Sequence, residues 1–424
     1  MKLLRFGICG LLAFSVLAHG GVEDWARAVF ETGAGLLFLY WALRFYLRRE
    51  SSFFLSPLLF PLAAFLLVAL AQWVFRISVS PYETRVELQL LLADFLTLFL
   101  AVQVFRTLED WKNFVWFIMI FSFGVAIFGI LQHLTFNGKL YWFREMRYGG
   151  IPFGPYVNRN HFAGFAELTV PITLIPLILG KVRRERLFIV GVFAVVQVGA
   201  LLLSASRGGI ISFGCQLAVI ALWMIFRRAQ GKQLIAGAAV LLVALALVSW
   251  LGVRQILQRF STMQSLEVSD SKRISMWRGS WHIFLDHPLL GTGLGTLQTV
   301  YPRYETLYDG KVVNHSHNDY LEALAETGVV GGLFCASFLG ILFLESRRRL
   351  WQPASAFTNS LQLAGLVACV GFLAHGFVDF NLHIPANALL FLLTAHLAST
   401  EILATVAPLS SSRGSRLRTN PANH

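Results

Sequence analysis

Charged residues are scarce in this sequence. Only 14% of its 424 residues are Asp, Glu, Lys or Arg, whereas a soluble domain typically carries about 25%. In their place stand apolar runs, such as 54–75, 114–131 and 236–250, which recur along most of the chain. A helical run of about 20 apolar residues can span the hydrocarbon core of a membrane, because a helix pairs its own backbone polar groups. The composition therefore excludes a soluble enzyme and indicates an all-α, polytopic membrane protein.

Cysteine is also scarce, and its positions exclude two kinds of stabilisation. The four cysteines all fall inside apolar runs, and none belongs to a Cys-x-x-Cys pair; they are Cys9, Cys215, Cys335 and Cys369. They indicate small core residues rather than a disulfide framework or a zinc knuckle. The net charge of +12 could suggest nucleic acid, but the basic residues cluster in short loops between the apolar runs. Membrane topology explains that distribution, so no nucleic-acid partner is expected.

The apolar runs predict twelve transmembrane helices. Their ranges are 4–20, 27–46, 54–76, 89–107, 113–134, 160–180, 187–204, 209–226, 233–252, 318–345, 359–381 and 385–407. With the N-terminus inside, 20 of the 35 Lys and Arg residues are cytoplasmic, and 7 of the other 15 lie in one long loop, where charge has little effect on topology. We therefore expect a multi-pass protein of the bacterial inner membrane with both termini cytoplasmic. Residues 1–21 also resemble a signal peptide, but Leu17–Ala18–His19 is a poor cleavage site, so an uncleaved first helix is favoured.

The connections between the predicted spans divide the chain. Two external segments, 135–159 and 253–317, are much longer than the others, and long loops in compact proteins are usually functional or disordered. Apolar residues of the second segment recur at helical spacing, which predicts an amphipathic helix on the outer membrane surface; they are Ile274, Trp277, Trp281, Phe284 and Leu285. Pro288 ends that helix. The expected division is 1–134 for the N-terminal membrane helices, 135–345 for the region holding both long segments, 346–407 for the C-terminal membrane helices and 408–424 for a disordered cytoplasmic tail.

The densest polar cluster is residues 314–320, Asn-His-Ser-His-Asn-Asp-Tyr. Asp319 and Glu322 have the spacing of a capping box, which predicts a helix start and places His317 just outside it. A helix N-terminus attracts a phosphate, and a histidine there can take a proton from a hydroxyl near neutral pH. Two other interpretations stay open: a plain interfacial cap, and a metal bound by His315 and His317 with Asp319 or Glu322. No third metal-ligating group is apparent elsewhere in the sequence, so no metal is expected.

Two arginines in the external loops have alternative interpretations. Arg207 follows Ser206 in a short turn between two apolar spans. It either snorkels to the membrane surface or binds a phosphate, since a guanidinium contacts two phosphate oxygens at once. Arg273, at the start of the predicted loop helix, is by itself an ordinary surface charge.

Other polar positions are less informative. Arg159 and His161 enter a span that also holds Glu167, and they form either a polar site or a helix cap. Residues 291–295, Gly-Thr-Gly-Leu-Gly, follow no predicted strand and indicate a turn rather than a nucleotide site. The sequence assigns no role to three further polar groups inside the predicted spans, which are expected to face the interior: Asp94, His375 and Asp379.

Taken in order, these motifs resemble the O-antigen ligase and polymerase superfamily over about residues 150–345. The matching motifs are Ser206–Arg207–Gly208, Arg273 to Trp277, Pro288 to Gly295, and His315 to Leu321 with Glu326 and Gly328. The resemblance implies a C-type glycosyltransferase fold that needs neither a cofactor, a metal nor a nucleotide sugar. It also implies an undecaprenyl-diphosphate-linked glycan as donor at the periplasmic face. The acceptor would be lipid A–core, another lipid-linked glycan or a protein.

The resemblance also assigns roles to residues. Arg207 and Arg273 would bind the diphosphate, and His317 would orient or deprotonate the acceptor hydroxyl. Substrate-binding residues would be His315, Asn318, Arg159 and His161. A transporter or flippase of lipid-linked glycans, in contact with membrane lipids, is the alternative class, because it also needs about twelve spans. It would not need an outer loop of about 65 residues rich in His and Arg.

Overall fold

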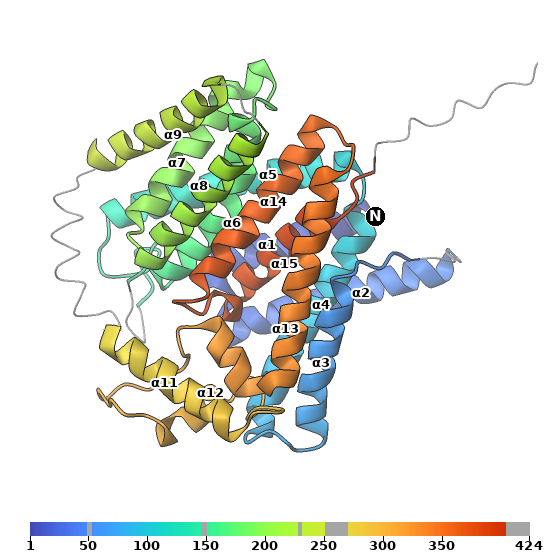
Figure 1. The fold of residues 1–424 in the computed structure, drawn as a ribbon, viewed down its shortest axis with the longest axis vertical. Helices are drawn as coiled ribbons and strands as arrows, with labels where there is room; N and C mark the ends of the chain where they lie inside the picture. The colour runs from blue at the N-terminus through green and yellow to red at the C-terminus, as the bar shows by residue number, and fades with distance from the viewer. Residues whose placement is uncertain (49–52, 146–150, 228–230, 251–269, 404–424) are drawn as a thin grey trace, which may run out of the picture.

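The computed structural model describes residues 1–48, 53–145, 151–227, 231–250 and 270–403, and in this part of the chain it consists of helices without a β-strand (Figure 1). Twelve helices coincide with the twelve expected spans. They are α1 (Lys2–Leu17), α2 (Asp24–Leu47), α3 (Leu59–Val74), α4 (Pro81–Val104), α5 (Leu108–Leu134), α6 (Arg159–Ile178), α7 (Leu187–Leu203), α8 (Arg207–Phe226), α9 (Gly231–Trp250), α13 (Asp319–Trp351), α14 (Ala356–His375) and α15 (Pro385–Ser399).

Eight helices in the described residues are long and apolar enough to cross a membrane: α4, α5, α6, α7 with the turn before it, α8, α9, α13 and α14. The apolar helices α3 and α15 have only 16 and 15 residues, fewer than the roughly 20 that a span requires. The structure thus gives a helical membrane protein with eight candidate spans, and the number twelve stays a prediction. The expected cytoplasmic tail 408–424 lies outside the described residues.

The centre of the bundle is α6. Its apolar window is completely buried, and it packs against α14, α7, α8 and α15. A helix that is apolar on all sides needs such an enclosure. The polar residues of α6 are therefore also enclosed, among them Arg159, His161 and Glu167. This brings ionisable groups into the middle of the helix bundle.

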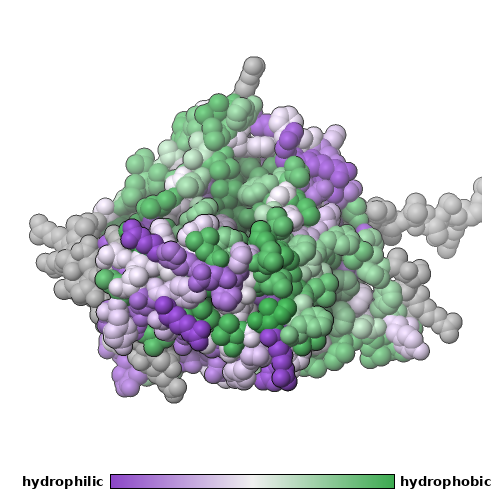
Figure 2. Space-filling view, turned by 60° about the horizontal axis from the view of Figure 1, so that its bottom comes forward, coloured by the Kyte–Doolittle hydropathy of each residue, from purple (hydrophilic) through white to green (hydrophobic). Residues whose placement is uncertain are grey.

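The described part of the long external segment is folded. It contains α11 (Asp270–Asp286), α12 (Leu297–Val300) and a 3-10 turn at Tyr301–Arg303, at the bottom of Figure 1. A small core of its own joins these elements to α13, made by Met276, Ile283, Leu297, Val300, Tyr301, Val313 and Ala325. Figure 2 shows hydrophilic residues gathered at this end of the molecule, with hydrophobic surface around them. The predicted loop helix exists and ends at Asp286 as expected, but it begins three residues before Arg273.

The glycine-rich segment 288–295 folds against a break in α13. The break is Gly328, whose backbone angles (φ 63°, ψ −166°) suit glycine. There the helix opens, and the amide of Val329 donates to the carbonyl of Pro288 at 2.8 Å. The Glu326 carboxylate accepts hydrogen bonds from the amides of Gly295 (2.8 Å) and Leu297 (2.9 Å). The glycine run is thus a turn that anchors the external segment to α13.

Candidate active site

The start of α13 is capped by Asn318. Its Oδ1 accepts hydrogen bonds from the amides of Tyr320 (3.1 Å) and Leu321 (3.0 Å). The expected capping box of Asp319 and Glu322 is wrong: Asp319 is the first helical residue, and Glu322 instead accepts from the amide of Ser316 at 2.7 Å. Asn318 was expected to bind substrate, but its amide group donates to the carbonyl of Phe377 at 3.1 Å and ties this helix end to the loop after α14.

His317 lies just before this cap and faces a buried carboxylate. Its Nδ1 is 3.4 Å from Oδ1 of Asp379, and the Asp379 side chain is fully buried while that of His317 is 14% exposed. The left-handed backbone of His317 (φ 52°) orients the ring. Because Nδ1 faces the acid, Nε2 on the other side of the ring is left to meet a substrate. The geometry is that of a histidine oriented by an aspartate, which favours general-base chemistry.

Asp379 is the centre of a buried histidine cluster. His161 Nε2 and His375 Nε2 each lie 4.0 Å from its carboxylate. Burial alone would raise the pKa of Asp379, but its contact with His317 and the charges of His161 and His375 outweigh burial and hold the pKa well below its usual value. Asp379 is therefore ionised and can stabilise a protonated histidine. The sequence placed this acid inside the predicted span 359–381, but α14 ends at His375 and Asp379 lies in the loop that follows. The sequence did not link it to His317.

A second buried acid extends the cluster into α6. Glu167 Oε1 lies 2.8 Å from Nδ1 of His375, and both side chains are almost completely buried. Four ionisable groups therefore follow one another from the bundle centre toward the site: Glu167, His375, Asp379 and His317. Nothing in the sequence signalled this order, because the groups come from three separate segments of the chain.

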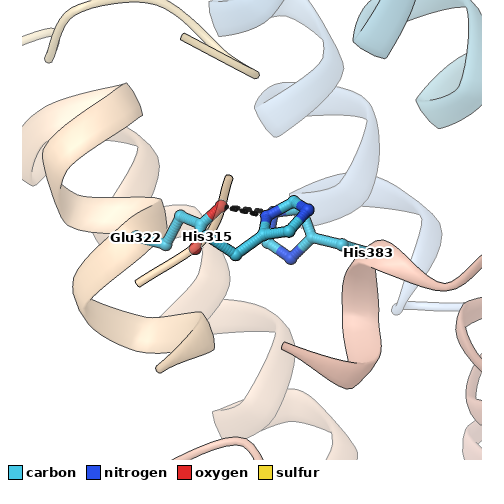
Figure 3. A group of neighbouring side chains, drawn as sticks. All are labelled: His315, Glu322 and His383. Carbon is cyan, nitrogen blue, oxygen red and sulfur yellow. Dashed lines mark hydrogen bonds and ion pairs between the residues drawn. The ribbon is translucent and has the colours of Figure 1, made fainter. Parts of the chain in front are cut away.

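His315 belongs to a different cluster. Its Nδ1 lies 2.7 Å from Oε1 of Glu322, and His383 Nε2 lies 3.3 Å from the same oxygen (Figure 3). His383 also contacts Asp319, with Nδ1 at 3.2 Å from Oδ1. The ring of Phe380 stacks on His315 at 4.2 Å and meets His317 edge-on at 4.9 Å. The two histidines of the His-x-His motif therefore face different carboxylates.

The His315 cluster has the residue types of a metal site. The ligand atoms of His315, Glu322 and His383 all lie within 4.8 Å of one another. His383 is a further metal-ligating side chain that was not apparent from the sequence, and His317 is not part of the set. Burial lowers the pKa of His383, but the charges of Glu322 and Asp319 outweigh burial and raise the pKa to about 10. A metal would have to displace that proton, so the cluster is held together by its own charges at neutral pH.

Arg207 is the first residue of α8, at the rim of the histidine cluster. Ser206 caps the helix, because its Oγ accepts from the amide of Gly209 at 3.1 Å. The side chain of Arg207 is exposed. The next residue, Gly208, packs so closely on His375 that a Cβ atom would lie 2.5 Å from the imidazole Nε2. The Ser-Arg-Gly turn therefore places the start of α8, and with it Arg207, beside the buried cluster.

Arg273 lies on α11, which packs against α13. It is half-buried and lies one helical turn before Trp277, so both side chains occupy one face of the helix. The Trp277 indole approaches the carbonyl oxygen of His317 at 3.4 Å. This contact was not foreseen, and it aligns the Arg273 face of α11 with the start of α13.

The start of α6 supplies both a cap and a site residue. Asn158 Oδ1 accepts from the amide of Asn160 at 2.9 Å, which is the helix cap considered from the sequence. Arg159 is buried at the same helix end, and its amide donates to the carbonyl of Ile151 at 2.7 Å. His161 Nε2 faces Asp379, so this expected substrate-binding residue joins the histidine cluster.

Comparison with known families decides what this region is. Residues 192–336 match the Wzy_C family model, described as O-antigen ligase. The chain carries an O-antigen ligase domain. The match runs from α7 into α13 and includes Arg207, Arg273, His315 and His317, which confirms the resemblance drawn from the motifs. No curated protein matches the chain. The matched region does not contain His161 or Asp379. The cluster around His317 is therefore completed by residues that precede and follow the matched region in the sequence.

Proposed function

We propose that this protein is a membrane glycosyltransferase of the O-antigen ligase or surface-polysaccharide polymerase type. It moves a glycan from undecaprenyl diphosphate to a hydroxyl acceptor at the periplasmic membrane face. The observation that carries the proposal is the contact between His317 and buried Asp379, with Arg207 and Arg273 on the two helices that border it. The O-antigen ligase domain supports the reaction class.

The proposed chemistry is one displacement. The acceptor hydroxyl gives its proton to Nε2 of His317, and its oxygen forms a bond to the anomeric carbon of the glycan. The bond between that carbon and the diphosphate oxygen breaks, so the lipid diphosphate leaves with an added negative charge. Asp379 stabilises the imidazolium that forms, in the way a carboxylate stabilises a protonated histidine in other enzymes.

Arg207 and Arg273 bind the leaving diphosphate. A guanidinium is always charged and contacts two phosphate oxygens at once. Positive groups fixed where charge develops stabilise the transition state more than the ground state. Two arginines supply this charge without a metal, and we propose that the reaction needs neither a metal nor a nucleotide sugar.

The test is a reconstituted transfer reaction. Purified protein is supplied with undecaprenyl-diphosphate glycan and, in separate reactions, lipid A–core or a second lipid-linked glycan, and the products are separated on a gel. We expect a shifted product with one acceptor from the wild type and none from His317→Ala. The matched control is His282→Ala, because His282 is an exposed histidine of α11. Glycan translocation without transfer, or full transfer by His317→Ala, overturns the proposal in favour of a transporter or of another base.

A further inference from the structure

A cavity of ≈ 470 Å³ lies at the other end of the helices that carry the histidine cluster. It is bordered by the start of α5, the connection from α6 to α7 and the start of α14. Helix α14 begins at this cavity with Ala356 and ends at the histidine cluster with His375, so its 20 residues separate the two places by about 30 Å. The cavity is therefore distinct from the candidate active site. Its volume falls in the range of ligand sites, roughly 300–1,000 Å³.

The lining of this cavity has two chemical halves. One half is apolar and includes Val115, Trp116, Met119, Pro176 and Val190. The other half is cationic and consists of Lys112, Lys181, Arg183 and Arg186. Among the described residues that line the cavity, none is acidic. Glu185 lies between two of the arginines in sequence but does not line the cavity.

Two of the cations lie over aromatic rings. The Arg186 guanidinium carbon is 4.8 Å from the centre of the Trp116 ring, and Lys112 Nζ is 5.6 Å from that of Phe357. Such stacking covers the apolar stem of each side chain and fixes the position of its charge. Lys112 and Arg186 are therefore held at the cavity.

Topology alone accounts for basic residues at helix ends, but it does not bring four of them around one apolar cavity. α5, α6 and α7 are all candidate spans, and the cavity lies at their ends. The ends of a membrane span meet the lipid headgroups. A ligand for this site needs a negative headgroup next to an apolar body. Basic pockets between membrane helices bind phospholipid headgroups by this combination.

We propose that the cavity binds an anionic phospholipid, with its phosphate against the four cations and its acyl chains against the apolar half. The ligand comes from the surrounding bilayer, and its class is a phospholipid with net negative charge. This site is independent of the proposed transfer reaction, because none of its residues belongs to the histidine cluster.

The test is native mass spectrometry of the full-length protein in detergent. The protein is mixed with equal amounts of a phosphatidylglycerol and a phosphatidylcholine that have the same acyl chains. We expect retention of phosphatidylglycerol over phosphatidylcholine by tenfold or more. The variant Lys112→Gln/Lys181→Gln/Arg183→Gln/Arg186→Gln should lose this preference, since each cation contributes about fivefold.

The matched control removes four exposed charges of expected cytoplasmic segments that do not line the cavity, in Arg184→Gln/Lys232→Gln/Arg347→Gln/Arg348→Gln. It should retain phosphatidylglycerol like the wild type. If the first variant does not fold, Arg186→Gln alone should weaken retention about fivefold, and salt should weaken retention by the wild type. Full retention by the cavity variants, equal loss in the control, or displacement of the lipid by millimolar inorganic phosphate overturns the proposal.

Discussion

A Cβ atom at Gly208 would lie 2.5 Å from Nε2 of His375, and His375 cannot move away freely because Glu167 holds its other ring nitrogen at 2.8 Å. The glycine after Arg207 is thus required by the buried cluster. We predict that Gly208→Ala lowers the transfer rate about tenfold or more, since the shift of His375 disturbs Asp379. Gly214→Ala in the same helix is the control, because a Cβ atom there meets nothing within 4 Å. Rates and membrane levels of both variants are compared, and equal rates contradict the proposed link.

Asp379→Asn tests the charge of the cluster. An amide keeps the shape of the side chain but cannot stabilise a protonated His317, so we expect transfer to fall by about 100-fold or more. Binding of the lipid-linked donor should change little, because the arginines stay in place. Asp94→Asn is the control, since Asp94 is a buried acid of α4 outside the histidine cluster. A rate for Asp379→Asn close to that of the control would remove Asp379 from the mechanism.

The arginines are tested by substitutions that keep the charge. A lysine presents a point charge without the planar fork of a guanidinium. Arg207→Lys and Arg273→Lys should each lower kcat/KM about tenfold or more, which corresponds to about 1.4 kcal/mol of transition-state binding. Arg278→Lys is the control, because Arg278 is exposed on α11. Normal turnover by the first two variants would make both arginines ordinary surface charges.

A chelator distinguishes a mechanism in which His317 is the general base from one that requires a bound metal. We expect wild-type transfer to be unchanged in EDTA, His317→Ala to be inactive and His315→Ala to be partly active, because the two histidines face different acids. If His315, Glu322 and His383 bind a required metal, EDTA should inactivate the wild type and His383→Ala should be as severe as His315→Ala. Recovery of activity with added zinc or magnesium would then overturn the metal-free mechanism.

Topology is tested by cysteine labelling in intact cells. In a variant without the four native cysteines, a cysteine at Tyr308, a side chain that is 77% exposed, should react with a membrane-impermeant maleimide. A cysteine at Glu185, in the connection before α7, should react only after the cells are opened. The reverse pattern would place the histidine cluster on the cytoplasmic side and exclude a periplasmic reaction.

Local patterns were predicted well from the sequence. The apolar runs gave the helices, Pro288 gave the end of α11, and the polar cluster gave the start of α13. The Ser-Arg-Gly and His-x-His motifs could be recognised as polar segments at helix starts, because each is short and has its own chemistry.

Contacts between distant segments could not be predicted in this way. Asp379 lies 62 residues after His317 and more than 200 after His161. The packing of α14 against α6 brings His161 to Asp379, and the contacts of Asn318 and Asp319 with the loop after α14 bring His317 to it. The third side chain of the His315 cluster, His383, was missed for the same reason. The capping error has a different cause. Asn318 and Asp319 are both good N-cap residues, and Asn318 becomes the N-cap of α13 because its side chain is also held by the carbonyl of Phe377.

The anchoring of the glycine-rich segment has a consequence for protein engineering. Gln72 of α3 donates to the carbonyls of Leu290 (2.6 Å) and Glu326 (2.8 Å) and accepts from the amide of Leu294 (3.0 Å). Thr84 of α4 donates to the carbonyl of Leu294 at 2.9 Å. A chimera that takes residues 135–345 from a relative must therefore also take the partner side chains of α3 and α4. The N-terminal helices and the ligase domain should therefore be exchanged together in a chimera, although the family match covers residues 192–336 and not the N-terminal helices.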